Sequence, residues 1–86
     1  MAEYAVLVVR SARKEIERLE SGIADRVVKR IEKLAAEPRP PGCRKVVGAE
    51  FLWRIRLGEY RILYTIDDAH LIIDVVAVRH RRDAYR

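Results

Sequence analysis

The sequence predicts an α+β fold in which two helices lie on one face of a curved, mostly antiparallel sheet. The main evidence is a change in hydrophobic period, from helical spacing in the first half of the chain to alternation in the second half. A short apolar stretch also precedes the helical part, and only two or three turn residues separate the later strands. The expected order is therefore β-α-α-β-β-β. The 86 residues are enough for one small domain spanning residues 1–86.

The first strand is predicted at residues 4–9, a continuous apolar stretch rich in β-branched side chains. Such a stretch is typical of a strand buried on both faces. Ser11 follows it and is expected to be the N-cap of the first helix. Within that helix, Ala12, Ile16 and Leu19 recur at helical spacing and predict one apolar face.

The second helix has the clearest periodic pattern in the chain. Ile23, Val27, Ile31 and Leu34 form one apolar stripe at helical spacing. The preceding residues 21–22 separate the two helices, and Ser21 is a candidate cap for the second. This helix is expected to end before residue 38, where the chain enters a proline-rich loop. Two such helices joined by a short turn predict a helical hairpin packed on the sheet.

Three further strands are predicted in the second half of the chain. Residues 51–57 alternate between apolar and basic side chains, and residues 60–66 and 70–78 continue the β pattern. The separating segments, at residues 58–59 and 67–68, are short turns. Strands this close together pair as antiparallel hairpins. The helices would then cover one face of the sheet and leave the other available for function.

The composition favours a polyanionic partner. The formal net charge is +5, which suits nucleic acid, a ribosome or an acidic protein, although a basic soluble protein without such a partner remains an alternative. The single cysteine, Cys43, excludes an internal disulfide and a multi-cysteine zinc site. No membrane-length apolar stretch and no signal-peptide pattern is visible, so a cytoplasmic protein without membrane contact is expected.

Basic side chains gather on one face of the predicted sheet. Arg54 and Arg56 share a strand face because side chains alternate along a strand, and Arg61 would lie opposite Arg56 if the hairpin closes at residues 58–59. Glu59 is the only acidic residue in the stretch 51–66. Because like charges destabilise a sheet when they face each other, and because arginine binds phosphate in a bidentate manner, the pattern indicates a phosphate-binding surface. The alternative is a solvated face, or arginines paired with Asp74 and Asp83.

Four segments together resemble one protein family. These are SARKEIERL at residues 11–19, EPRPPG at 37–42, WRIRLGEYRILYTIDD at 53–68 and VRHRRDAYR at 78–86. In this order they are similar to the RelE/ParE superfamily, the toxins of type II toxin–antitoxin systems. The resemblance covers nearly the whole chain. It implies the RelE-like fold and a cognate antitoxin protein that neutralises the toxin.

Within that superfamily, the residues favour the RelE type. RelE-type members cut mRNA in the ribosomal A site by attack of a ribose 2′-hydroxyl on the adjacent phosphate, without a metal or another cofactor. The resemblance therefore implies the ribosome and mRNA as partners. It also implies a site built from arginines and a C-terminal tyrosine. The catalytic residues expected from it are Arg61, Arg81 and Tyr85, and the substrate-binding residues are Arg54, Arg56, Arg82 and His80.

The general base of this mechanism is left open between two residues. Tyr85 is the first candidate, because neighbouring cations favour the phenolate. His80 is the alternative, since its ordinary pKa suits neutral pH, although it would face away from Arg81 if the strand continues. Arg54 and Arg56 stand where lysine is common in the family, and arginine cannot serve as a base.

Two other functions stay open at this level. One is a ParE-like inhibitor of DNA gyrase without nuclease activity. The other is a degenerate toxin that only binds its antitoxin in a repressor complex. The arginines at the family positions and Tyr85 favour the RNA-cleaving enzyme over both.

Overall fold

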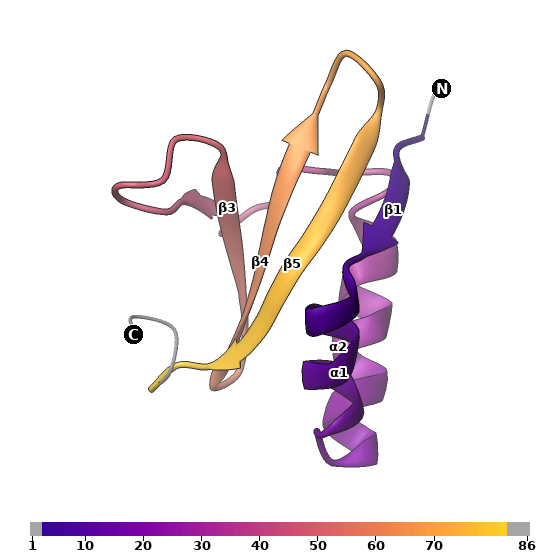
Figure 1. Cartoon of the computed structure of the whole chain (residues 1–86), viewed down its shortest axis with the longest axis vertical. Coiled ribbons are helices and arrows are strands. Elements are labelled where there is room, and N and C mark those ends of the chain that lie inside the picture. The colour runs from indigo at the N-terminus through magenta and orange to yellow at the C-terminus, as the bar shows by residue number, and fades with distance from the viewer. Residues whose placement is uncertain (1–2, 83–86) are drawn as a thin grey trace.

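The computed structural model describes residues 3–82 and shows two helices against a five-stranded sheet (Figure 1). The predicted element order is confirmed, with one very short strand added after the helices. The elements are β1 (Ala5–Val8), α1 (Arg10–Glu17), α2 (Ser21–Lys33), β2 (Arg44–Lys45), β3 (Leu52–Leu57), β4 (Tyr60–Asp67) and β5 (Ile72–His80).

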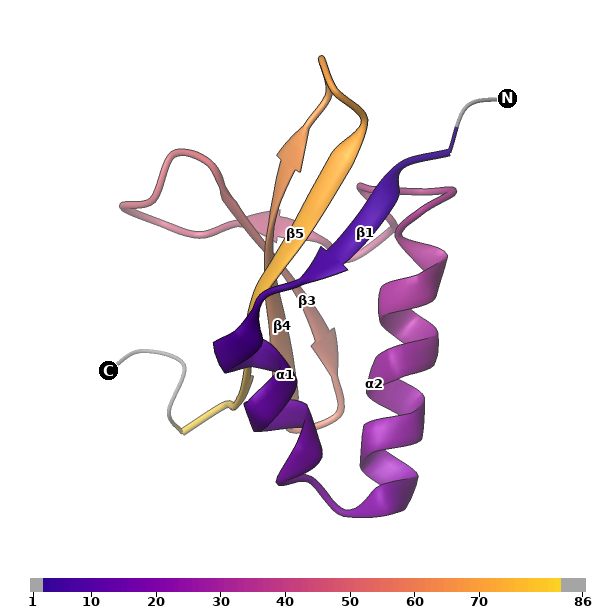
Figure 2. The ribbon, with the colours of Figure 1, turned by 45° about the vertical axis from the view of Figure 1, so that its right-hand side comes forward.

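The strand order in the sheet is β1-β5-β4-β3-β2. β1 runs parallel to β5, and the other neighbouring strands are antiparallel. The two helices lie side by side on one face of this sheet, whereas no helix in the described part of the chain covers the other face (Figures 1 and 2). The predicted α+β fold with a helical hairpin on one face is thus confirmed.

The core lies between the helical hairpin and the sheet face that it covers. The apolar stripe of α2 is buried as predicted, because Val27, Ile31 and Leu34 are at most 5% exposed. Each such side chain contributes about 1.5–3 kcal/mol when it is fully buried. The buried cluster consists of Ala12, Val27, Ile31, Leu34, Ile55, Ile62, Tyr64, Ile73, Val75 and Val78.

The prediction that the first strand is buried on both faces is wrong. Leu7 is 53% exposed and Ala5 is also exposed, whereas Val6 and Val8 are partly buried. The reason is that β1 is an edge strand of a sheet that is covered on only one face. The continuous apolar stretch therefore reflects a strand with one solvent-facing side.

The predicted helix caps are also wrong. α1 begins at Arg10 and its N-cap is Val9, because the Val9 N–H still bonds the Val75 carbonyl in the sheet while the Val9 carbonyl already accepts from Arg13. β1 therefore leads directly into α1, which begins one residue before Ser11. The N-cap of α2 is Glu20 rather than Ser21, and neither cap makes a side-chain hydrogen bond.

An irregularity in the β4–β5 pairing decides which way the end of β5 faces. Tyr64 pairs with Val75, but Leu63 pairs with Ala77, so Val76 is an extra residue in β5. Such a bulge reverses the alternation of side chains beyond it. As a result Val78 pairs with Ile62 on the helix-covered face, and Arg79 pairs with Arg61 on the open face.

Polar contacts hold the β4–β5 turn and the loop after α2 in place at one end of the sheet. Asp68 in the β4–β5 turn accepts hydrogen bonds from the Tyr4 hydroxyl and from the Arg39 guanidinium, the latter at 2.8 Å. The bond from Arg39 and then that from Tyr4 lower the pKa of Asp68 below its ordinary value. The Tyr64 hydroxyl donates to the Pro38 carbonyl at 2.8 Å, and burial raises the pKa of this phenol. The loop after α2 is thereby held against the sheet.

Candidate functional site

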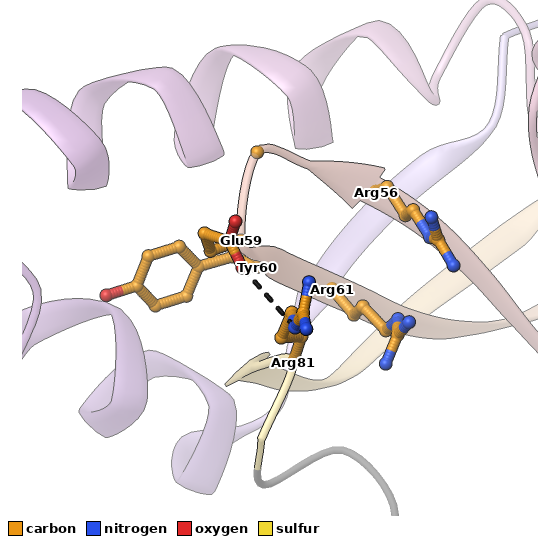
Figure 3. A pocket seen from close by; sticks show the side chains of 6 residues that line it. Arg56, Glu59, Tyr60, Arg61 and Arg81 are labelled. Carbon is orange, nitrogen blue, oxygen red and sulfur yellow. Dashed lines mark ion pairs between the residues drawn. The ribbon is translucent and has the colours of Figure 1, made fainter.

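A basic cavity lies at the end of the sheet where the β3–β4 turn meets the end of β5 (Figure 3). Its volume is about 480 Å³. Three guanidinium groups and one carboxylate line it, so its charge favours an anionic ligand. The lining residues are Arg56, Gly58, Glu59, Tyr60, Arg61 and Arg81.

Strand pairing brings the arginines together. A two-residue turn joins β3 to β4, and Gly58 has the positive φ of 59° that its first position requires in a type II′ turn. This turn sets Arg56 opposite Arg61, as predicted. The bulge in β5 then sets Arg79 opposite Arg61, so three arginines stand in one row across β3, β4 and β5.

The three cavity arginines differ in burial. Arg61 is 7% exposed, whereas Arg56 and Arg81 lie at the surface. Their side chains extend toward the same side of the sheet, and the Tyr60 ring points the other way (Figure 3). A phosphate group in the cavity would therefore meet one deeply set guanidinium and two exposed ones.

Glu59 connects the turn to the residue that follows β5. The Arg81 N–H donates to the Glu59 carbonyl at 2.7 Å, and the Arg81 Nε lies 3.5 Å from the Glu59 Oε2 (Figure 3). Both side chains are more than 60% exposed, so this ion pair contributes little to stability. Its main effect is to fix Arg81 beside the cavity.

His80 does not join the other predicted site residues. It pairs with Tyr60 on the helix-covered side, and the two rings meet edge to face with their centroids 5.3 Å apart. There it lines a different groove, together with Glu15 and Leu19 of the α1 region. Its Nδ1 accepts a hydrogen bond from the Arg82 N–H at 3.3 Å. The structure therefore separates His80 from Arg61 and Arg81.

Of the remaining predicted site residues, the structure describes Arg54 and Arg82. Arg54 is on the same face of β3 as Arg56 and lines a neighbouring cavity that Arg56 shares. Arg82 is exposed at the end of the described chain and does not line either cavity. Tyr85 lies outside the described residues.

Two residues in or beside the site were not expected to be there from the sequence. Glu59 was interpreted only as a turn residue, although its being the sole acid among these arginines was a visible signal. Arg79 joins the row by register, but its Nε lies 3.3 Å from the Glu15 Oε2, so α1 draws its side chain to the sheet edge. Nothing in the sequence pattern shows the bulge that causes this arrangement.

The described residues contain no group of three His, Cys, Asp or Glu side chains that could hold a metal ion. The arginines that line the cavity can stabilise negative charge on a bound ligand, and Glu59 places one carboxylate beside them.

The family is shown by comparisons with known proteins. The family model described as the ParE toxin of the type II toxin–antitoxin system parDE matches residues 6–85. Toxin RelG of Mycobacterium tuberculosis is 35% identical over an alignment of 86 positions. The alignment covers 96% of this chain and 97% of that protein. Toxin RelE of the same organism is 30% identical, with 96% and 87% covered.

Solved structures agree with the sequence comparisons. The toxin–antitoxin complex RelBE2 of M. tuberculosis matches with a TM-score of 0.81 and 30% identity, over 92% of this chain and 99% of that chain. The archaeal RelE–RelB complex of Pyrococcus horikoshii matches with a TM-score of 0.82 and 25% identity, over 95% and 99%. The expected RelE-like fold is therefore confirmed.

Fold and cavity together define a small basic protein with an arginine-lined cavity on an open sheet face. The chain belongs to the RelE/ParE superfamily of toxins of type II toxin–antitoxin systems. The curated relatives at 30% identity or more carry RelE-type names, so the ParE alternative is not favoured. Neither helix in residues 3–82 has the length and apolar character needed to cross a membrane.

Proposed function

We propose that this protein is an mRNA interferase that cuts mRNA in the ribosomal A site by metal-independent transesterification. The observation that carries the proposal is the convergence of Arg56, Arg61 and Arg81 on one cavity of the open sheet face. RelE-type relatives with matching length and fold support it.

In the proposed reaction, a ribose 2′-oxygen attacks the adjacent phosphorus. A bond forms between these two atoms, and the bond from phosphorus to the 5′-oxygen of the next nucleotide breaks. The products are a 2′,3′-cyclic phosphate and a free 5′-hydroxyl. One group must take the proton of the 2′-hydroxyl, and another must supply a proton to the leaving oxygen.

Arg61 and Arg81 would stabilise the charge that develops on the phosphorane. Their guanidinium groups are positioned before the substrate arrives, which is the most effective form of electrostatic stabilisation. Arg61 suits the equatorial oxygens because it is deeply set, and Arg56 and Arg81 are accessible to the flanking backbone. Arg54 and Arg82 would bind the RNA strand beyond the reacting phosphate.

The proposed base is Tyr85. An arginine keeps its proton, so Arg56, Arg61 and Arg81 cannot perform this step. His80 is given no role at the reacting phosphate, because it faces the groove beside α1. The ribosome would hold the messenger in the attack conformation and so supply much of the rate.

The proposal includes a cognate antitoxin. Relatives with solved structures were captured as complexes with RelB. We propose an acidic partner that covers the open, basic sheet face of this chain, because charge complementarity directs such association.

The test is inducible expression in bacteria with primer extension on translated messages. Wild type should produce new in-frame 5′ ends, and the double variant Arg81→Ala, Tyr85→Phe should not. Arg13→Gln on the exposed surface of α1 is the matched control and should cut like wild type. Growth arrest with intact messages and damaged DNA would instead indicate gyrase as the target.

A further inference from the structure

A second basic cavity lies beside the first at the free edge of β3. Its volume is about 470 Å³, and it differs from the first in having no acidic residue in its lining. Arg56 lines both cavities, so the two adjoin each other at this residue of β3. The lining residues are Arg30, Pro41, Gly42, Arg44, Arg54, Ile55 and Arg56.

Three elements that are distant in the sequence build this cavity. β2 pairs only with Trp53 and Arg54, so β3 has no neighbouring strand on this edge from Ile55 onward within the described residues. Arg30 reaches the open edge from α2, and Arg44 stands opposite Arg54. The local sequence therefore does not explain why four guanidinium groups meet here.

Among residues 3–82, no acidic side chain forms an ion pair with any of these four arginines, because no carboxylate lies within 4.0 Å of the charged groups of Arg30, Arg44, Arg54 or Arg56. Arg39, Arg79 and Arg81, by contrast, each have an acidic partner. Because Arg44 and Arg54 face each other across two strands, the arrangement costs stability in the free protein. An external anion would remove that cost.

We propose that this second cavity binds the phosphodiester backbone of an RNA strand at phosphates outside the one that is cut. A guanidinium group can donate two parallel hydrogen bonds to phosphate oxygens. Because Arg56 lines both cavities, one RNA strand can reach both of them. The inference rests on the proposed function, since it deepens the account of its substrate. The second cavity contributes affinity and register, whereas the first contributes the chemistry.

The test compares Arg30→Gln, Arg44→Gln with the charge-matched control Arg13→Gln, Lys14→Gln on exposed α1. Binding of fluorescent single-stranded RNA is measured by anisotropy over a series of salt concentrations. Each phosphate contact contributes about 0.7 to the slope of log K against log salt, so the double variant should lose about 1.4. Affinity near physiological salt should then fall on the order of tenfold.

Length dependence makes the test specific to two adjoining sites. The loss should appear with an oligonucleotide long enough to reach both cavities and be absent with a dinucleotide, which the first cavity can hold alone. The single variant Arg44→Gln removes an exposed side chain and should show half of the slope change. On programmed ribosomes, the half-saturating concentration should rise and the maximal cleavage rate should not change.

Three results for the double variant Arg30→Gln, Arg44→Gln would overturn the inference. The first is an unchanged slope of log K against log salt, and the second is an equal loss of slope in the α1 control. The third is unchanged RNA binding together with lost binding of an acidic polypeptide such as polyglutamate. The last would assign the cavity to a protein partner. The proposed function fails separately, if wild type cuts no message on the ribosome. Intact cleavage with an unchanged slope would leave that function standing and remove only the second cavity.

Discussion

At the scale of single residues, Arg61 is the side chain on which the proposed chemistry depends most. It is the one buried charged residue in the described chain and stands in the centre of the arginine row. A buried planar guanidinium can hold a bidentate geometry that a lysine ammonium cannot reproduce. Charge alone is therefore insufficient at this position.

Replacing Arg61 by glutamine should lower the rate of ribosome-dependent cleavage by about 10²–10³, the usual effect of losing one donor that stabilises transition-state charge. Arg61→Lys should recover only part of that rate. Single-turnover cleavage of a defined message measures both. Arg79→Gln is the control, because it removes the neighbouring arginine whose side chain is drawn to Glu15. Equal losses in the two glutamine variants would contradict the assignment.

Glu59 should limit how tightly the cavity holds RNA. Its carboxylate is an anion beside Arg81, so an incoming phosphate must compete with it. Glu59→Gln should strengthen RNA binding by up to about fivefold, since exposed ion pairs of this kind are worth about 0–1 kcal/mol. The control is Glu32→Gln on exposed α2, which changes the net charge equally. If both variants gained the same affinity, long-range charge would be the explanation.

The sequence predicted part of this site. Alternation along β3 correctly placed Arg54 and Arg56 on one face, and the short turn correctly placed Arg61 opposite Arg56. The side on which Arg81 and His80 lie depends on the extra residue Val76. A bulge arises from strand pairing over the whole sheet and has no signature in an apolar stretch such as residues 75–78.

At the scale of elements, the β3–β4 hairpin carries the cavity, and Gly58 determines its closure. A φ of 59° is strained for any residue with a Cβ. Gly22 in α2 has no such conformation, and a Cβ there would meet nothing closer than 3.9 Å. The two glycines therefore offer a matched pair.

Gly58→Ala should destabilise the fold by more than about 1 kcal/mol, and Gly22→Ala should be neutral or stabilise it by up to about 1 kcal/mol. Urea unfolding followed by circular dichroism gives both values. The Gly58 variant should also cleave RNA more slowly at temperatures where it remains folded, because Arg56 and Arg61 lose their register. If Gly58→Ala were as stable as Gly22→Ala, the turn would not be strained.

The long periodic elements were predictable from the sequence, whereas the short strand β2 and the exact starts of the helices were not. α2 and the three later strands follow directly from spacing, because their buried faces impose the pattern. β2 consists of Arg44 and Lys45, both exposed, so it carries no hydrophobic signal. The helix starts were misplaced because β1 leads into α1 without a capping side chain.

At the scale of the whole molecule, Asp68 connects three segments that are distant in the sequence. Its own turn between β4 and β5 is bonded to Tyr4, which precedes β1, and to Arg39 in the loop after α2. These bonds are made to the ionised carboxylate. Because they stabilise the ionised form over the protonated form, they lower the pKa of Asp68 in the folded protein.

The contribution of Asp68 should therefore depend on pH with a definite sign. A carboxyl with a lowered folded-state pKa stabilises the fold fully above its ordinary pKa of 3.8 and loses that effect as the pH falls through the folded value. Asp68→Asn should lower the urea midpoint at pH 7 and differ less from wild type as the pH drops below about 4. The exposed α2 variant Asp25→Asn is the control. A difference that stayed constant with pH would refute this account.

The parallel pairing of β1 with β5 joins the two most distant strands of the chain. Ala5 pairs with Ile72, and Val8 pairs with Val75. A contact of such high sequence separation forms late, because the intervening loop must be closed first and non-local topology slows folding. During synthesis, β1 and the helical hairpin are made before their partner strand exists. The sheet, and with it the arginine row that includes Arg79, is completed only when β5 has been made, so the nascent chain carries no assembled cavity before that strand exists.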